Sequence, residues 1–270
     1  MSHNHTLNLV EAEIGGGRIS KKTIDQIESS DSGFLKISGL TQETFEYFVG
    51  NYGGRFTSIE FWKCPLISDL SPLETLGDIE AISYYWNQRA EKLWDMSKNT
   101  RLTRFAFEDF TRVKSLEQVS ACTSLKELTF GNKVWVTQEI DSLEPLKQLK
   151  NLCKLGFYIK KVLDGRLAPI SELPQLSSVD FPLNLFSTEK LAWLTSRIGD
   201  KTQSRCLAPY HRIEKPIDDG SKKKDTFIVG KRKPLLDWNQ DRERISKYTQ
   251  KFEALVAKYK ANLSIPEPEK

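Results

Sequence analysis

Histidine is scarce in this chain, and long apolar runs and closely spaced cysteines are missing. The 270 residues include only His3, His5 and His211, and no G-x-S-x-G, H-E-x-x-H or phosphate-loop spacing occurs, so common enzyme signatures are lacking. No apolar run approaches the roughly 20 residues of a membrane span, and the first residues lack the order of a signal peptide. The four cysteines form no CxxC pair. We therefore expect a non-enzymatic cytoplasmic protein with reduced thiols, no metal site and no cofactor.

Positive charge is concentrated near the C-terminal end. Residues 201–270 contain 17 Lys and Arg against 10 Asp and Glu, whereas residues 1–200 contain 23 against 26. Two basic clusters flank one predicted strand, and such clusters suit an acidic partner or nucleic acid. No interleaved aromatic residues support base stacking, and a solvated hairpin is the alternative explanation. The cluster residues are Lys222, Lys223, Lys224, Lys231, Arg232 and Lys233.

A repeat of 22 to 27 residues runs through the middle of the chain. Its pattern is seen in Phe56-x-x-Ile59-x-Phe61-x-x-Cys64-x-Leu66, which fits L-x-x-L-x-L-x-x-N/C-x-L. Copies of the core pattern start at 34, 56, 79, 102, 125, 152 and 176, and the third apolar position is Phe or Tyr in most of them. The near-constant spacing of about seven copies is the evidence for a repeat protein.

The pattern predicts a stack of short strands. Alternate residues of each strand point inward, and stacked copies bury these faces while their strands pair in a parallel sheet. Pro72 and Pro145 stand where single helical turns would begin on the convex side. We expect Cys64, Asn87 and Asn184 to turn the chain after their strands, whereas Phe110 and Lys133 do not fit this place.

The second half of the repeat carries a family resemblance. The phrases Ile67–Leu73 (ISDLSPL) and Ile140–Leu146 (IDSLEPL) resemble the short repeats of internalins and related bacterial leucine-rich-repeat proteins. The resemblance covers residues 34–200 and implies an α/β solenoid, a leucine-rich-repeat horseshoe with a parallel concave sheet. The secretion and wall-anchoring segments of internalins are not recognisable, so the resemblance does not imply their role in adhesion to host cells.

Both ends of the stack need covering, because an open end exposes core and strand edge. We expect residues 1–33 to form an N-terminal cap, with a short helix that begins after Ser20. Residues 34–200 form the repeats. Residues 201–270 are predicted to form a C-terminal cap of two strands, 206–213 and 226–229, and a helix, 239–262. The tail from Ser264 is expected to be frayed.

The concave face is the predicted binding surface. Strand residues between the inward positions point out of the concavity, and ladders of such residues bind partners in solenoids. Trp62, Tyr85 and Trp86 are expected to cluster with Arg104 beside them, and Trp, Tyr and Arg are common interface anchors. Asp109 and Tyr158 complete the candidate set. The alternative is that these aromatic side chains only cover neighbouring strands. The sequence thus predicts a protein-interaction module and leaves its partner and oligomeric state open.

Overall fold

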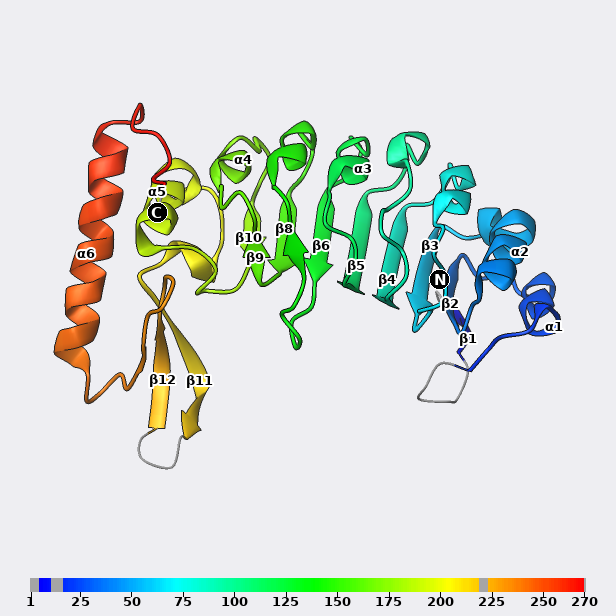
Figure 1. The fold of residues 1–270 in the computed structure, drawn as a ribbon, viewed down its shortest axis with the longest axis horizontal. Helices are drawn as coiled ribbons and strands as arrows, with labels where there is room; N and C mark the ends of the chain where they lie inside the picture. Colours follow the sequence, from blue (N-terminus) through cyan, green and yellow to red (C-terminus); the bar gives the residue numbers. More distant parts are fainter. Residues whose placement is uncertain (1–4, 11–16, 219–222, 270) are drawn as a thin grey trace.

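Eight parallel strands form one sheet that runs through the whole stack of repeats (Figure 1). The computed structural model describes residues 5–10, 17–218 and 223–269. The sheet order is β1-β2-β3-β4-β5-β6-β8-β10. The strands are β1 (Thr6–Leu9), β2 (Phe34–Ser38), β3 (Ser58–Trp62), β4 (Ala81–Asn87), β5 (Arg104–Phe110), β6 (Glu127–Gly131), β8 (Lys154–Tyr158) and β10 (Ser178–Asp180).

Each of the seven predicted copies supplies one strand of this sheet, but the first is two residues out of the predicted phase, because Phe34 pairs with Ser58 rather than taking the place of Phe56. The strands pair in a constant register, so that Ile59 lies beside Ile82 and Ile82 beside Phe105. The inward residues of neighbouring copies therefore stack on one another, as the period-two alternation requires. The predicted leucine-rich-repeat solenoid with a parallel sheet is confirmed.

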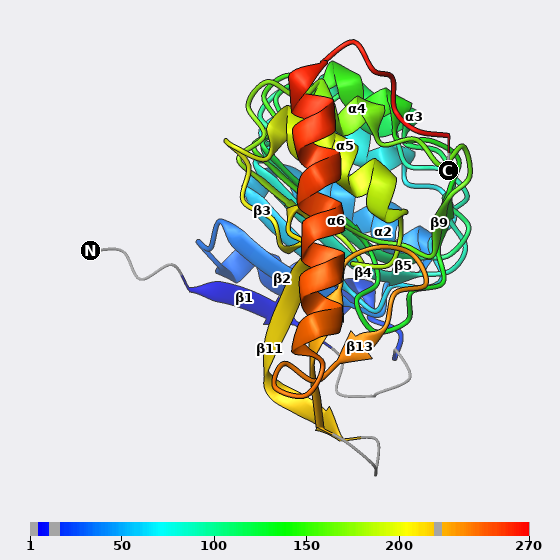
Figure 2. The same ribbon diagram turned by 90° about the vertical axis from the view of Figure 1, so that its left-hand side faces the viewer.

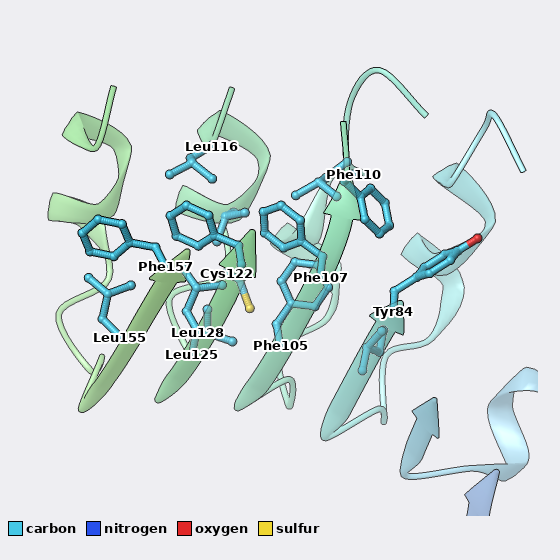
Figure 3. Packing of buried hydrophobic residues seen from close by; sticks show 14 of the residues in the cluster. Tyr84, Phe105, Phe107, Phe110, Leu116, Cys122, Leu125, Leu128, Leu155 and Phe157 are labelled. Carbon is cyan, nitrogen blue, oxygen red and sulfur yellow. The ribbon is translucent and has the colours of Figure 1, made fainter. Parts of the chain in front are cut away.

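A row of aromatic rings forms the centre of the core (Figure 3). Phe107, Phe130, Phe157 and Phe181 are fully buried and stack in succession, with ring centroids 4.8 to 5.7 Å apart. They occupy the third apolar position of the repeat, where the sequence has Phe or Tyr in most copies. Each ring pair contributes about 1 kcal/mol beyond the burial of its area. The aromatic variant of the repeat thus produces a continuous spine.

The convex side carries short helical turns (Figure 2). Pro72 and Pro145 lie at the starts of η3 and η5, which confirms the turns predicted from the sequence. Their fixed φ suits the first helical residue, where no backbone donor is needed. The turns are η3 (Ser71–Thr75), η4 (Met96–Lys98), α3 (Glu117–Ser120), η5 (Glu144–Gln148) and α4 (Ala168–Ser171), preceded by the longer α2 (Gln42–Tyr52) and η2 (Gly53–Arg55).

The turns after the strands use the predicted polar residues in two of three cases. Asn87 is fully buried, and its Nδ2 donates to the carbonyl oxygen of Ile67 at 2.9 Å. Its Oδ1 accepts from the N–H groups of Arg89 and Ala90 at 3.0 and 2.9 Å. The amide thus links two neighbouring repeats and satisfies backbone groups that the strands leave unpaired.

The other predicted turn residues differ from one another. Cys64 is buried beneath the end of β3, as expected, and Phe110 fills the same place as an apolar residue. Asn184 is exposed in a turn instead, so that prediction is wrong. Its repeat continues into α5 (Thr188–Ile198) rather than into another strand.

The sheet begins inside the segment predicted as an N-terminal cap. β1 pairs in parallel with β2, Thr6 beside Phe34. The predicted helix start at Ser20 is confirmed, because its hydroxyl accepts from the N–H of Thr23 at 3.2 Å. The helical segment consists of α1 (Lys21–Ile24) and η1 (Asp25–Ser29).

A hairpin and a long helix close the C-terminal end (Figures 1 and 2). The first hairpin strand begins four residues later than predicted, since Arg205–Leu207 form a helical turn, and it continues to Asp218. The second strand begins at Lys223 rather than 226, and a third short strand joins them. The predicted helix is confirmed as α6, which packs on α5 through the Lys251–Glu189 ion pair at 2.9 Å. The elements are η6 (Arg205–Leu207), β11 (Tyr210–Asp218), β12 (Lys223–Ile228), β13 (Leu235–Leu236) and α6 (Arg242–Ala261).

The tail after α6 is docked, contrary to the prediction that it is frayed. Arg197 donates to the carbonyl oxygens of Leu263 and Ile265 at 2.8 and 2.9 Å. The carboxylate of Glu267 accepts from the N–H groups of Leu167 and Ala168 at 2.7 and 2.9 Å. These bonds span up to 100 residues of sequence, so no local pattern indicates them.

Candidate functional site

A groove of about 390 Å³ lies at the edge of the sheet where β3, β4 and β5 end. We call it the aromatic groove. Successive repeats contribute to it in register, since Trp62 pairs with Tyr85 and Tyr85 with Glu108. Its lining residues are Trp62, Lys63, Tyr85, Trp86, Gln88, Glu108, Asp109, Asn132, Val134 and Trp135. Four of the six predicted binding residues are therefore together, namely Trp62, Tyr85, Trp86 and Asp109.

The backbone bends in the same way at the ends of these three strands. Lys63, Trp86 and Asp109 have φ of 50°, 66° and 60°, in the left-handed region. This turn sends the next residue of each repeat inward to the core and leaves the left-handed residue at the groove. For a residue with a Cβ the conformation costs about 1–2 kcal/mol, and a bulky residue such as Trp is rare there.

The aromatic rings of the groove contact one another and two ammonium groups. The rings of Trp62 and Tyr85 meet edge to face at 5.6 Å between centroids. Lys63 Nζ lies 5.8 Å from the centroids of both Trp62 and Trp86, and Lys36 Nζ lies 4.7 Å from that of Trp62. These distances are within the range of cation–π attraction.

Two carboxylates belong to the same surface. Burial raises the pKa of Glu108, an effect that nearby Lys133 opposes and Asp109 reinforces. Burial also raises the pKa of Asp109, whereas a hydrogen bond with the side chain of Asn132 lowers it. Half-buried carboxylates with raised pKa are under-solvated, so the ionised groups would gain from a cation at this place.

The groove is bordered by a loop that interrupts the repeat, residues 132–138, hereafter the 132–138 loop. It projects beyond the sheet edge after β6 (Figure 1). Gly131 has φ of 93°, and a Cβ there would overlap the carbonyl oxygen of Tyr158, so only glycine fits. Gly131 pairs with Glu108, so the left-handed residue comes one position earlier in the register than Asp109 does in the preceding repeat. The chain then extends away from the stacked repeats as a loop.

The loop has a defined shape and an apolar tip. Asn132 Oδ1 accepts from the N–H groups of Val134 and Trp135 at 2.8 and 2.9 Å. At the base, buried Gln138 donates to the carbonyl oxygen of Val113 at 2.9 Å. Between these anchors Val134 and Trp135 are 75% and 69% exposed. Adjacent large apolar side chains that are exposed on a loop held by hydrogen bonds are typical of interaction sites.

Sequence reasoning missed Trp135, although two signals pointed to it. The copies that start at 125 and 152 are 27 residues apart, against 22 to 24 elsewhere. The extra residues include the run Val134–Val136, and an apolar run in an insertion has no core to enter. The short strands β7 (Glu139–Ile140) and β9 (Lys161–Val162) pair beneath the loop.

Two predicted residues lie away from the groove. Arg104 begins β5, so roughly 16 Å of strand separates it from Asp109 at the other end. The expectation that it lies beside the aromatic cluster is wrong, because the register fixes it at the opposite edge of the sheet. Tyr158 ends β8, and its hydroxyl donates to Asp180 at 2.6 Å, where Arg205 also donates. Tyr158 thus belongs to a half-buried network near the last repeat.

The predicted basic patch is divided between several places. Lys222 is outside the described residues, and Lys223 and Lys224 lie on β12 of the hairpin. Lys233 Nζ lies 5.4 Å from the centroid of the Tyr248 ring on α6. Lys231 and Arg232 join residues from the preceding repeat in a second cavity of about 470 Å³, hereafter the basic pocket. Its cationic residues are Lys160, Lys161, Lys190, Lys231 and Arg232.

Seven stacked copies in one parallel sheet, six of them with an inward Phe or Tyr at the third apolar position, define a leucine-rich-repeat solenoid. No helix within the described ranges is long and apolar enough to cross a membrane. Within those ranges, too, no three His, Cys, Asp or Glu side chains are grouped as a metal site would need. Cys64, Cys122 and Cys206 are buried free thiols, and Cys153 is half-buried and free.

Comparison with protein-family models and with curated proteins found no match. Three similar solved structures come from Listeria monocytogenes. The internalin InlF has 12% identity and a TM-score of 0.41, and the match covers 69% of this chain and 62% of that chain. Internalin C2 has 17% identity and a TM-score of 0.33, with 61% of this chain and 77% of that chain covered. The functional domain of InlJ has 13% identity and a TM-score of 0.43, with 80% of this chain and 50% of that chain covered. This chain thus spans about three fifths of the length of InlF.

Proposed function

We propose that this chain is a non-enzymatic module that binds a protein partner through the aromatic groove and the tip of the 132–138 loop. The observation that carries the proposal is the exposure of Val134 and Trp135 beside the half-buried rings of Trp62, Tyr85 and Trp86. Three successive repeats and an interruption of the stack are needed to assemble this surface.

The composition of the surface supports a protein partner. Trp and Tyr anchor interfaces because they bury a large area at a small cost in side-chain entropy. The neighbouring carboxylates and lysines provide a polar rim, which is the usual arrangement around an apolar interface centre. The site lies at the ends of three neighbouring strands, where their residues are presented side by side.

Affinity capture from native lysate with matched variants tests the proposal. The variant Val134→Ser/Trp135→Ser removes the exposed tip, and Ile217→Ser removes an apolar side chain that is 47% exposed on the hairpin. The free energy of unfolding of both variants should lie within about 0.5 kcal/mol of the wild-type value, because these side chains are at the surface. The captured protein is then purified and its dissociation constant measured against all three forms.

We expect the partner to bind wild type and Ile217→Ser alike and to bind the loop variant at least about 30-fold more weakly, as for the loss of interface anchors. A partner that binds all three forms equally contradicts the proposal. Capture of nucleic acid alone, lost at high salt, contradicts it as well and favours the second candidate.

The second candidate function is binding of an acidic partner at the basic pocket. Five cationic side chains from three segments line this cavity, together with the apolar Leu163 and Phe186 and the acidic Glu269. The variant Lys161→Glu/Lys231→Glu reverses two exposed charges there. Loss of a captured partner with this variant, and not with the loop variant, would assign the function to the basic pocket.

A further inference from the structure

The aromatic groove is not uniformly apolar, and its charges indicate what occupies it. Glu108 and Asp109 contribute carboxylates to the same cavity as the rings of Trp62 and Trp86. An apolar occupant would desolvate both carboxylates without giving them a partner, which is costly for charged groups. An anionic occupant would add repulsion. A cationic occupant satisfies carboxylates and aromatic faces together.

We propose that the aromatic groove accepts an arginine side chain of the protein partner, with its guanidinium against the indole rings of Trp62 and Trp86 and its N–H groups directed to Glu108 and Asp109. This inference rests on the proposed function, because it names the chemistry that the partner presents to that site. Arginine suits both the aromatic rings and the carboxylates of the groove, since its guanidinium is planar, stacks on aromatic faces and binds carboxylates in a bidentate manner.

The chain itself shows that these rings accept a cation. Lys63 Nζ lies equally far, 5.8 Å, from the ring centroids of Trp62 and Trp86. It thus marks a position from which both indole faces attract positive charge. Lys63 comes from the turn of the same repeat as Trp62, so its ammonium competes with any cation that a partner brings.

The backbone points to the same place. Trp86 is held at φ of 66°, and strained residues concentrate at binding sites. Phe or Leu would serve as well at Trp86 if packing alone mattered.

Two other lysines near the groove have contacts of their own. Lys36 is paired with Glu60 at 2.6 Å, and Lys133 lies 4.7 Å from the centroid of the Tyr158 ring, where it acts on Glu108 only through space. Asp109 bonds the neutral side chain of Asn132. The carboxylate of Asp109 is therefore the principal place at which an incoming guanidinium gains a charge-assisted bond.

Titration with short peptides tests the inference without the natural partner. The probes are acetyl-Gly-Arg-Gly-amide and the same peptide with citrulline, which has the shape of arginine and no charge. The readout is the indole N–H resonance of Trp86, assigned with a Trp86→Phe variant. We expect saturable binding of the arginine peptide on the order of millimolar and binding of the citrulline peptide about tenfold weaker.

Two variants provide the controls. Glu108→Gln/Asp109→Asn keeps the side-chain shapes and removes the negative charges, so it should reduce the preference for arginine over citrulline to the part that comes from the indole faces. Lys63→Met removes the competing ammonium and should tighten binding of the arginine peptide. Equal binding of the two peptides to wild type overturns the inference, and so does equal binding of a lysine peptide, because that result shows attraction of any cation.

The outcomes with the purified partner separate this inference from the proposed function. If Val134→Ser/Trp135→Ser loses the partner while Glu108→Gln/Asp109→Asn binds it like wild type, the proposed function stands and the arginine assignment fails. Loss with both variants supports both proposals. Binding by both variants contradicts both.

Discussion

The turns after β4 and β6 begin from the same sheet and end differently. After β4 the left-handed residue is Trp86, and Asn87 then turns inward and bonds the neighbouring repeat. After β6 the left-handed residue is Gly131, one position earlier in the register, and Asn132 turns outward to shape a loop. A shift of one residue in a turn thus converts a regular turn of the stack into a projecting surface loop.

The difference also separates the turns that stabilise the fold from the surface that we propose for binding. In the regular turn the side chain amide satisfies buried backbone groups, so its loss weakens the fold. In the interrupted turn the amide holds a surface loop, and its loss affects the fold little. The 132–138 loop therefore exposes large apolar side chains without disturbing the packing of the repeats, since Phe130 and Phe157 still stack on each other beside the interruption.

The largest effect is expected at the regular turn. Asn87→Ala should lower the free energy of unfolding by about 3 kcal/mol, because several buried backbone groups lose their partners. Urea unfolding measures this change. The matched variant Asn132→Ala removes an asparagine from the interrupted turn and should cost about 1 kcal/mol or less. Equal costs at both positions would contradict the division into a structural and a recognition turn.

A smaller effect is expected where the loop leaves the sheet. Gly131→Ala should cost about 2 kcal/mol, because the positive φ and the overlap with Tyr158 both oppose a Cβ. Gly50→Ala is the control, since Gly50 lies in α2 and an added Cβ would have nothing within 4 Å. This variant should raise the free energy of unfolding by up to about 1 kcal/mol. Thermal unfolding measures both variants. A Gly131→Ala variant with the same melting temperature as wild type would falsify this explanation.

The smallest effect is a pH dependence that belongs to the groove alone. The raised pKa values of Glu108 and Asp109 mean that the folded state binds their protons more tightly than the unfolded state. Their contribution to stability therefore falls as pH rises from about 4, the usual carboxyl range. Glu108→Gln/Asp109→Asn should be slightly more stable than wild type at pH 7.

The measurement for this last prediction is the difference in unfolding free energy between wild type and the double variant across pH 4 to 7. The difference should shrink as pH falls, because wild type then becomes protonated at these groups. A constant difference would show that the two carboxylates are not under-solvated in the folded state, and it would weaken the case for a cationic occupant.

Much of the fold was predictable because the repeat acts locally. The direction of each side chain along a strand follows from the backbone, so Ile59 and Phe61 could be assigned to the core from alternation alone. The long C-terminal helix was predictable for the same reason, from its 3–4 spacing. The hairpin was anticipated with wrong ends, because extended backbone continues without a change in local pattern.

The candidate site was predictable only in part. Trp62, Tyr85 and Trp86 follow from the repeat phase, because equivalent positions of successive copies become neighbours. Arg104 was misplaced, since a residue at the start of a strand and one at its end share a face but not a location. Trp135 was missed, because an insertion has no phase that relates it to the rest of the chain.

The amino-acid sequence alone determined the repeat, most of its inward residues and the parallel sheet, because stacking similar units leaves one way to bury their apolar faces. Only the tertiary structure decided what those units bring together. The left-handed turn at Trp86, the loop released at Gly131, the tail held by Arg197 and the meeting of Lys161 with Lys231 depend on contacts between distant segments. Such contacts follow from register and backbone conformation, which no local periodicity encodes.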